Sequence, residues 1–163
     1  MKIFFLIMMV FTAVSANALT VDSINFEDKV KVAGKELVIN GVGIRKATFL
    51  KIKVYYGALY LSQKSNDAAA FLNTSDSKQI VMHFVRDVSV TDLKKTYREA
   101  FESANKETYK NLLPTLDAFS ANLNDVKKGE RMVITFLPDG ATLTFIGGKP
   151  SQKLVTQPSP RRC

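Results

Sequence analysis

The chain has 163 residues, 46% hydrophobic and 23% charged, with a formal net charge of +8. Its only cysteine is the last residue and its only histidine lies far away in sequence, which excludes an intrachain disulfide and a clustered zinc pattern. The basic charge is spread over the tail and strand-like segments without an RNA-reading or helix-turn-helix motif, so nucleic acid is not an expected partner. We expect neither a metal nor a cofactor.

The first residues have the pattern of a secretory signal peptide, residues 1–18. A positive start is followed by the apolar run 3–14 and by Ala16-Asn17-Ala18, an A-x-A cleavage pattern. The run is shorter than the roughly 20 residues that a membrane-spanning helix needs. We therefore expect cleavage between Ala18 and Leu19, no transmembrane segment in the mature chain, and a periplasmic or secreted protein. The lack of disulfides favours a bacterial periplasm.

After the expected cleavage about 145 residues remain, which is the length of one ordinary domain. We place that domain at residues 19–148. From Lys149 onward the sequence holds three prolines and scarcely any apolar periodicity. Residues 149–163 are therefore predicted to be an irregular tail.

Residues 24–32 and 35–39 alternate like two short strands joined at Gly34, which predicts a first hairpin. The next stretch is Asn40-Gly41-Val42-Gly43-Ile44-Arg45. Two glycines one residue apart permit a tight turn or a bulge between strands. Arg45 comes two residues after Gly43 and lies beside the apolar segment that follows.

Residues 50–61 predict a long strand that begins half exposed and ends buried. One face would carry Leu50, Ile52, Val54, Tyr56, Ala58 and Tyr60, and the other Lys51, Lys53, Tyr55 and Gly57. Since Tyr55 and Tyr56 are adjacent on a strand, they must face opposite ways. We favour Tyr55 as the one that lines a cavity.

The second half of the chain predicts helices and then strands. A short helix is expected at 68–72 and a strand at 79–85. Ser89 is a helix-start signal, and a set of residues recurs at helical spacing after it: Val90, Leu93, Tyr97, Ala100, Phe101 and Ala104. A second amphipathic pattern covers 109–123, where Pro114 predicts a kink or restart near Leu113.

Residues 131–137 and 141–146 alternate as strands around Pro138-Asp139-Gly140, a strong hairpin signal. The order of strands, helices and strands predicts an α+β fold. Its sheet should be largely antiparallel, with the helices packed on one face.

Four motifs occur in order: N-G-x-G-x-R at 40–45, A-L-Y-L at 58–61, T-Y-R-E-A-F at 96–101 and P-D-G at 138–140. Together they resemble the chalcone isomerase fold family, and more closely the bacterial chalcone isomerase-like proteins, over roughly 26–148. The resemblance implies an open-faced sandwich of sheet and helices. Plant relatives with this fold include true chalcone isomerases, which close a flavanone ring, and fatty-acid-binding proteins that hold an acyl chain in the same cleft.

The resemblance also implies roles for residues. Arg45 matches the family arginine that contacts the anionic oxygen of the ligand, and Tyr97 matches the tyrosine on the helix that lines the cleft. Two positions depart from the enzymes: their strand threonine aligns with Tyr55, and their helix asparagine falls near Ala104, with Asn105 one residue out of register. These departures weigh against isomerase chemistry.

The tail departs from the family as well. Family members follow the last hairpin with an amphipathic helix that closes one side of the cleft, and residues 149–163 cannot form such a helix. We therefore hypothesise a truncated or shifted reading frame after about Gly148.

Burial of an unpaired guanidinium costs several kcal/mol, so Arg45 at the start of an apolar strand predicts an anion nearby. The alternative is a surface arginine paired with a carboxylate. Tyr97 either turns its hydroxyl into a cleft or only packs in the core. His83, between Met82 and Phe84, has no visible catalytic partner and is interpreted as structural.

The leading hypothesis is an exported, non-catalytic domain that binds a small amphipathic anion such as a fatty acid or an aromatic anion. Its ligand-binding residues would be Arg45, Tyr55, Tyr97 and Asn105. One alternative is an intramolecular lyase of the chalcone isomerase type. Another is an envelope interaction module, in which basic strands recruit a protein or a lipid surface. The sequence sets neither the natural ligand nor the oligomeric state.

Overall fold

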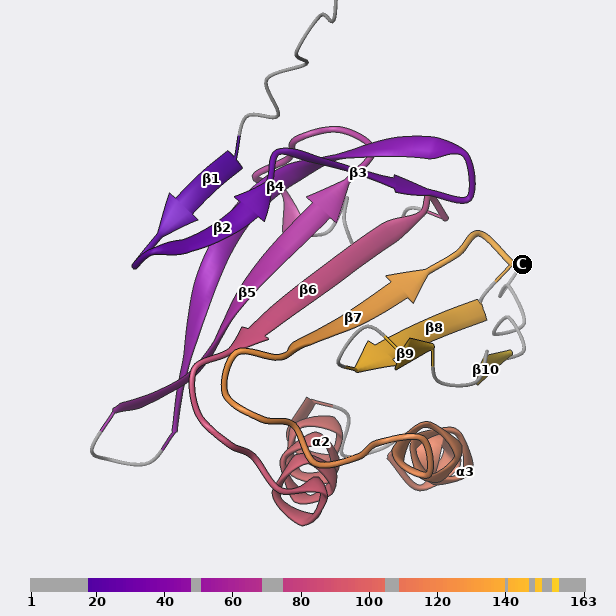
Figure 1. The fold of residues 1–163 in the computed structure, drawn as a ribbon. Helices are drawn as coiled ribbons and strands as arrows, with labels where there is room; N and C mark the ends of the chain where they lie inside the picture. The colour runs from indigo at the N-terminus through magenta and orange to yellow at the C-terminus, as the bar shows by residue number, and fades with distance from the viewer. Residues whose placement is uncertain are drawn as a thin grey trace, which may run out of the picture.

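The computed structural model describes residues 18–47, 51–68, 75–104, 109–139, 141–146, 149–150 and 154–155, the last three as backbone only. An eight-stranded antiparallel sheet dominates, and helices α2 (Val90–Ala104) and α3 (Tyr109–Ser120) lie against one face of it (Figure 1). The predicted α+β fold is confirmed. Across the sheet the strands are β10 (Leu154–Val155), β8 (Ala141–Ile146), β7 (Arg131–Phe136), β6 (Lys78–Phe84), β5 (Ile52–Leu61), β4 (Lys35–Ala47) and β3 (Lys29–Val32), while β9 (Lys149–Pro150) pairs with β8.

A separate hairpin, β1 (Ala18–Val21) with β2 (Ile24–Glu27), lies over the opposite face of the sheet (Figure 1). The sequence predicted one strand over residues 24–32, but the chain bends at Asp28, so its first part pairs with β1 and its second with β4. Both hairpin turns have two consecutive positive φ angles, 46° and 66° at Asp22-Ser23 and 48° and 79° at Ala33-Gly34. That conformation matches the twist of paired strands.

The glycine motif lies inside β4, which runs well beyond the predicted end at Ile39. The register changes from Ile39↔Tyr60 to Gly41↔Leu59, so Asn40 is an extra residue in a β-bulge. The Asn40 side-chain oxygen accepts a hydrogen bond from the Ser65 backbone amide at 2.7 Å, and the Asn40 side-chain nitrogen donates one to the Ser65 carbonyl at 3.0 Å. A shift of one residue exchanges the two faces of a strand. Gly41, Gly43 and Arg45 therefore face the helices, whereas Leu37 and Ile39 face the β1–β2 hairpin.

A second register change lies on β5, from Arg45↔Tyr55 to Lys46↔Lys53, which leaves Val54 as the extra residue. For this reason Val54 and Tyr55 pack in the same apolar cluster. The predicted unbroken alternation through residues 50–60 is wrong at this point. The strand does begin exposed and end buried, as predicted.

Helix α2 begins where Ser89 predicts. The Ser89 Oγ accepts a hydrogen bond from the Asp92 amide at 3.1 Å and donates to the Asp92 carboxylate at 2.8 Å, which satisfies a free amide of the first turn. Helix α3 continues through Pro114 as one element, so of the predicted kink or restart the restart is wrong. Pro114 lies in the second turn, where its missing N–H removes only one intrahelical bond.

Each face of the sheet has its own core. The cluster on the hairpin side consists of Phe26, Val32, Leu37, Ile39, Tyr56, Ala58, Tyr60 and Val81. The cluster on the helix side consists of Met82, Phe84, Leu93, Leu123, Val126, Met132 and Ile134, with Tyr55 and Tyr97 packed against it. Tyr55 and Tyr56 thus face opposite ways, as predicted.

Strand β8 spans the predicted residues 141–146. Within the predicted irregular tail, the two-residue strands β9 and β10 both pair with β8. The remaining tail residues, 151–153 and 156–163, lie outside the described ranges. Residues 1–17 of the predicted signal peptide 1–18 and almost all of the predicted helix at 68–72 also lie outside them, and Ala18 is the first residue of β1. None of the helices in the described ranges is both long and apolar enough to cross a bilayer.

Candidate functional site

Three neighbouring strands place a row of side chains on the helix-facing side of the sheet. Arg45 of β4 lies directly opposite Tyr55 of β5, and Tyr55 lies directly opposite Phe84 of β6. Residues directly opposite each other in adjacent strands share a face. The Tyr55 and Phe84 rings are 5.3 Å apart between centroids, at an interplanar angle of 51°. The sequence gave no signal for Phe84 in the site, because a buried aromatic in a strand is typical of any core.

Helix α2 brings Tyr97 to the same place. Its ring meets that of Phe119 edge to face, with 5.1 Å between the centroids. Burial, and then the neighbouring Tyr55, raise the pKa of the Tyr97 hydroxyl. Burial also raises the pKa of Tyr55, against the opposing effect of the positive charge on Arg45. Arg45, Tyr55 and Tyr97 therefore lie near one another on the helix-facing side of the sheet, and we call these three residues the polar triad.

The polar triad has no internal partner in the described part of the chain. No carboxylate there lies within ion-pair distance of Arg45, whose side chain is exposed. No hydrogen bond to the hydroxyl of Tyr55 or Tyr97 is formed among the same residues. The burial expected for the Arg45 guanidinium is therefore wrong: Arg45 is a surface arginine, as in the alternative, but without a carboxylate partner among these residues. A partly buried tyrosine hydroxyl usually finds a hydrogen-bond partner, and neither of these two has one among the described residues.

Beside the polar triad the sheet surface is bare backbone. Gly41 and Gly43 of β4 and Gly57 of β5 carry no side chain on this face, and a Cβ placed at Gly41 or Gly43 would meet no described atom within 4 Å. A Cβ at Gly57 would lie 3.5 Å from the Tyr55 ring. The glycines thus leave an open strip next to the guanidinium, and Gly57 lets the Tyr55 ring lie close to the sheet.

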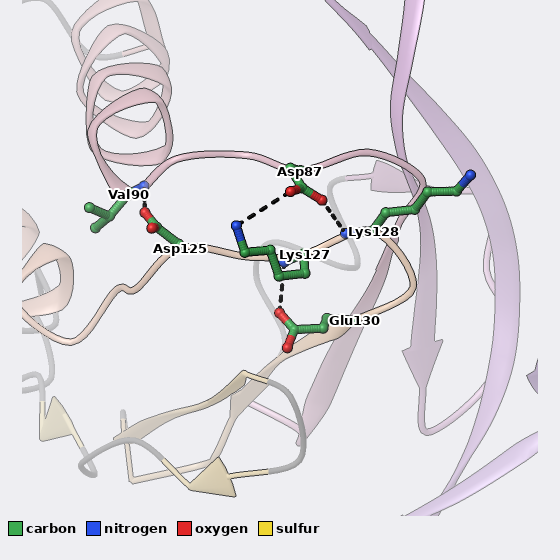
Figure 2. A network of polar contacts seen from close by, with 6 residues as sticks. All are labelled: Asp87, Val90, Asp125, Lys127, Lys128 and Glu130. Atoms are coloured by element: carbon green, nitrogen blue, oxygen red, sulfur yellow. Dashed lines mark hydrogen bonds and ion pairs between the residues drawn. The ribbon is translucent and has the colours of Figure 1, made fainter.

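A polar network holds the start of α2, and hence Tyr97, in place (Figure 2). The Asp87 carboxylate accepts a hydrogen bond from the Lys128 amide at 2.9 Å and lies 3.3 Å from the Lys127 ammonium. These two contacts, the backbone one first, lower the pKa of Asp87. The Val90 amide donates to Asp125 at 2.8 Å, and the Lys127 amide to Glu130 at 2.7 Å. The network joins segments about 40 residues apart, which no local pattern in the sequence could indicate.

Contacts between the helices complete the support. The Arg98 guanidinium lies 2.7 Å from the Asp117 carboxylate, which joins α2 to α3. Together with the ring contact between Tyr97 and Phe119, this pair fixes the rotation of α2 about its axis.

The opposite face of the sheet has no comparable group, because its polar side chains are satisfied. The Tyr56 hydroxyl and the Lys53 ammonium both donate to the Asp22 carboxylate, the latter at 2.6 Å. The Tyr60 hydroxyl donates to the Glu27 carbonyl at 2.8 Å. The Arg131 guanidinium donates to His83 Nδ1 at 3.4 Å.

Of the four predicted ligand-binding residues, the structure brings Arg45, Tyr55 and Tyr97 together. Asn105 lies outside the described residues. The described residues contain no group of three or more His, Cys, Asp or Glu side chains that could hold a metal ion.

Comparisons with known proteins agree with the predicted family and fold. The chalcone isomerase-like family model matches residues 18–157, beyond the predicted domain end at Gly148. No curated protein matches the sequence. A solved structure with this fold is the fatty-acid binding protein of Arabidopsis thaliana, with a TM-score of 0.67 and 14% sequence identity over 86% of this chain and 83% of the other. The family match covers most of the sequence, so this chain belongs to the chalcone isomerase-like family.

Proposed function

We propose that this is an exported, non-catalytic domain that binds a small amphipathic anion, with a fatty acid as the ligand class to test first. The observation that carries the proposal is the polar triad. A guanidinium and two tyrosine hydroxyls converge beside an apolar cluster, with no partner among the described residues. Planar guanidinium groups bind carboxylates through two parallel hydrogen bonds. Arg45 would hold the carboxylate, and Tyr55 and Tyr97 would hydrogen-bond it.

The surroundings of the polar triad suit an acyl tail. Gly41 and Gly43 offer space against the backbone, and the neighbouring positions on β5 and β6 are the apolar Leu59, Ile80 and Met82. Burial of each methylene contributes roughly 0.8 kcal/mol. Affinity should therefore rise with chain length, while the head group sets the orientation.

Two observations support binding rather than catalysis. Tyr55 stands where the resemblance predicts the threonine of the isomerases, and its bulky ring packs against Phe84. Burial raises the pKa of Tyr55 and Tyr97 further above physiological pH, so neither hydroxyl is poised as a base. The fold neighbour from Arabidopsis thaliana also supports the ligand class, because it is a fatty-acid binding protein.

Binding is tested with the whole chain expressed with its own N-terminus and purified without detergent. Native mass spectrometry and displacement of a fluorescent fatty acid should show one bound acyl chain, with affinity that increases with tail length. Arg45→Gln should weaken binding about ten- to hundredfold, because a charge-assisted hydrogen bond is lost. Arg86→Gln removes the same charge from an exposed site elsewhere and should leave the affinity unchanged.

Two results would contradict the proposal: a folded chain that ignores every acyl chain offered, or equal losses in the Arg45 and Arg86 variants. Turnover of a chalcone above its spontaneous rate would favour the isomerase instead. Export is tested separately by fractionation of a bacterial host. The product in the periplasm should have the mass of a chain that begins at Leu19, and an uncleaved cytoplasmic product would contradict export.

A further inference from the structure

The paired ends of β4 and β5 continue beyond the rest of the sheet (Figure 1, lower left). Strand β6 pairs with β5 only from Tyr55 onward, and β3 pairs with β4 only as far as Val38. Past Arg45, each strand is paired only with the other, through Lys46↔Lys53 and Ala47↔Ile52. We call the described residues 44–47 and 51–53 the ribbon end. Past Arg45 it is a two-stranded projection with no described strand on either side, whereas Ile44 and Arg45 lie opposite residues of β5 that still pair with β6.

The ribbon end is basic. From Leu37 to Leu61 the sequence contains Arg45, Lys46, Lys51 and Lys53 and no aspartate or glutamate. Lys53 is neutralised by Asp22 of the β1–β2 hairpin. Among the described residues no carboxylate pairs with Arg45, Lys46 or Lys51, and all three are exposed. Three cations therefore lie within one short projection without local compensation.

The ribbon end is also apolar. Ile44 is 41% exposed and Ile52 is 40% exposed, and the other large exposed apolar residues of the described chain lie on other elements. The two isoleucines lie on opposite faces of the ribbon. Ile44 is opposite Tyr56 and shares its face, whereas Ile52 is adjacent to Lys53, which reaches the same Asp22 as Tyr56. A flat protein surface would cover only one of the two isoleucines, whereas a lipid layer into which the ribbon end inserts would cover both.

We propose that the ribbon end docks on an anionic lipid surface. Ile44 and Ile52 would enter the boundary between head groups and acyl chains, and Lys46 and Lys51 would pair with lipid phosphates around them. Exposed apolar residues encircled by cations are the pattern of an interfacial anchor. The docking stands on the ribbon end alone. Only its consequence, that the ligand passes between the bilayer and the polar triad, rests on the proposed function.

Co-sedimentation with vesicles tests the proposal, with the whole chain purified free of ligand. Vesicles of phosphatidylcholine with a third of phosphatidylglycerol should bind the chain, and vesicles of phosphatidylcholine alone should bind it at least tenfold more weakly. Each cation near an anionic surface contributes about fivefold in partition. The double variant Lys46→Gln/Lys51→Gln should therefore bind about 25-fold more weakly, and its fatty-acid affinity should be unchanged. The wild-type partition should also fall as salt rises.

Two further variants separate docking from net charge. Lys94→Gln/Lys95→Gln removes two positive charges from the exposed side of α2 and should reduce binding less than twofold. Ile44→Ser/Ile52→Ser keeps the charge and should reduce binding about tenfold. Circular dichroism and the thermal midpoint of each variant confirm that the fold is kept; a misfolded double variant is replaced by the single Lys46→Gln and Ile52→Ser changes.

Several outcomes would overturn the docking: no binding to anionic vesicles, equal losses for the α2 lysines, or no effect of the isoleucines. A chain that ignores vesicles and forms a dimer dependent on Ile44 and Ile52 would make the ribbon end a contact between copies, which also overturns it. Vesicle binding without fatty-acid binding would leave the docking standing and contradict only the proposed function.

Discussion

Tyrosine side chains occur on both faces of the sheet, but among the described residues their hydroxyls have hydrogen-bond partners on one face only. On the hairpin side, Tyr56 and Tyr60 donate their hydroxyls to Asp22 and to the Glu27 carbonyl. On the helix side, Tyr55 and Tyr97 have no hydrogen-bond partner within the described chain. The difference separates structural tyrosines from candidate binding tyrosines. A satisfied hydroxyl contributes to folding, whereas an unsatisfied one near a cation costs stability until a ligand arrives.

The cations follow the same division. Lys53 is paired with Asp22, and Arg131 lies 5.6 Å from the centroid of the Phe26 ring and donates to the Asn25 carbonyl. These contacts hold the β1–β2 hairpin to the sheet. Arg45, on the other face, has no such contact among the residues described. Variants on each face can test this difference between the two faces.

The largest effect is expected from the core of the hairpin side. Phe26 is fully buried and Arg131 lies over its ring. Phe26→Ala should lower the free energy of unfolding by about 3–5 kcal/mol, through lost burial and a cavity. Urea unfolding followed by circular dichroism measures this loss. A decrease below 1 kcal/mol would mean that the hairpin does not seal this face.

The two kinds of tyrosine should respond differently to loss of the hydroxyl. Tyr60→Phe removes the bond to the Glu27 carbonyl and should lower the free energy of unfolding by about 1 kcal/mol, with fatty-acid affinity unchanged. Tyr97→Phe should leave stability unchanged or slightly higher and weaken fatty-acid binding several-fold. Chemical unfolding and ligand titration of both variants decide the matter. Equal behaviour of the two would remove the distinction between the faces.

Acid should weaken the hairpin side first. The Lys53 and Tyr56 contacts lower the pKa of Asp22. A lowered pKa means that the folded state holds the carboxylate ionised, so this stabilisation is present above about pH 4 and is lost as pH falls through the folded value. Asp22→Asn should therefore reduce stability at pH 7 and have less effect at pH 3. Unfolding curves for both proteins at the two values test it; an equal difference at both would show that the charge of Asp22 is not involved.

Alkali should act through Tyr60. Burial is the first cause that raises the pKa of Tyr60 to about 12. The unfolded chain ionises near pH 10, so the stabilisation present below that value is lost as pH rises toward 12. The Tyr60→Phe variant should lack this component. Stability measured between pH 9 and 11 compares the two, and identical slopes would contradict the assignment.

The smallest effect is expected at a turn outside both faces. Ala33 has a φ of 48° in the β3–β4 turn, a conformation that asparagine tolerates better. Ala33→Asn should raise the free energy of unfolding by roughly 0.5 kcal/mol. Differential scanning calorimetry should show a slightly higher midpoint with unchanged ligand affinity. A lower midpoint would indicate that Ala33 is held by contacts other than the turn.

Local patterns predicted much of the fold and little of the site. The start of α2 at Ser89 and the strand Ala141–Ile146 follow from capping and alternation, which are local. The bulge at Asn40 lies beside the glycines for which a turn or a bulge was expected, but the bulge at Val54 could not be predicted, because an extra apolar residue leaves a pattern that still resembles a strand. The division at Asp28 was missed because it depends on pairing with β1.

The site itself depends on long-range contacts. Arg45 and Tyr55 are paired across strands, and Tyr97 reaches them from a helix more than 40 residues later in the chain. No spacing rule joins these positions, and only the family resemblance suggested that they meet. The network around Asp87, which fixes α2, joins segments equally far apart and was not anticipated.

The extra residue at Asn40 has one further consequence. It decides on which side of the sheet every later residue of β4 lies, so the distance along the chain from Asn40 to Arg45 matters as much as the arginine itself. A homologue that lost this one residue would keep its glycines and its arginine, yet carry the guanidinium toward the β1–β2 hairpin. Such a protein would match the motif letter for letter over most of its length and be unable to hold an anion beside Tyr97.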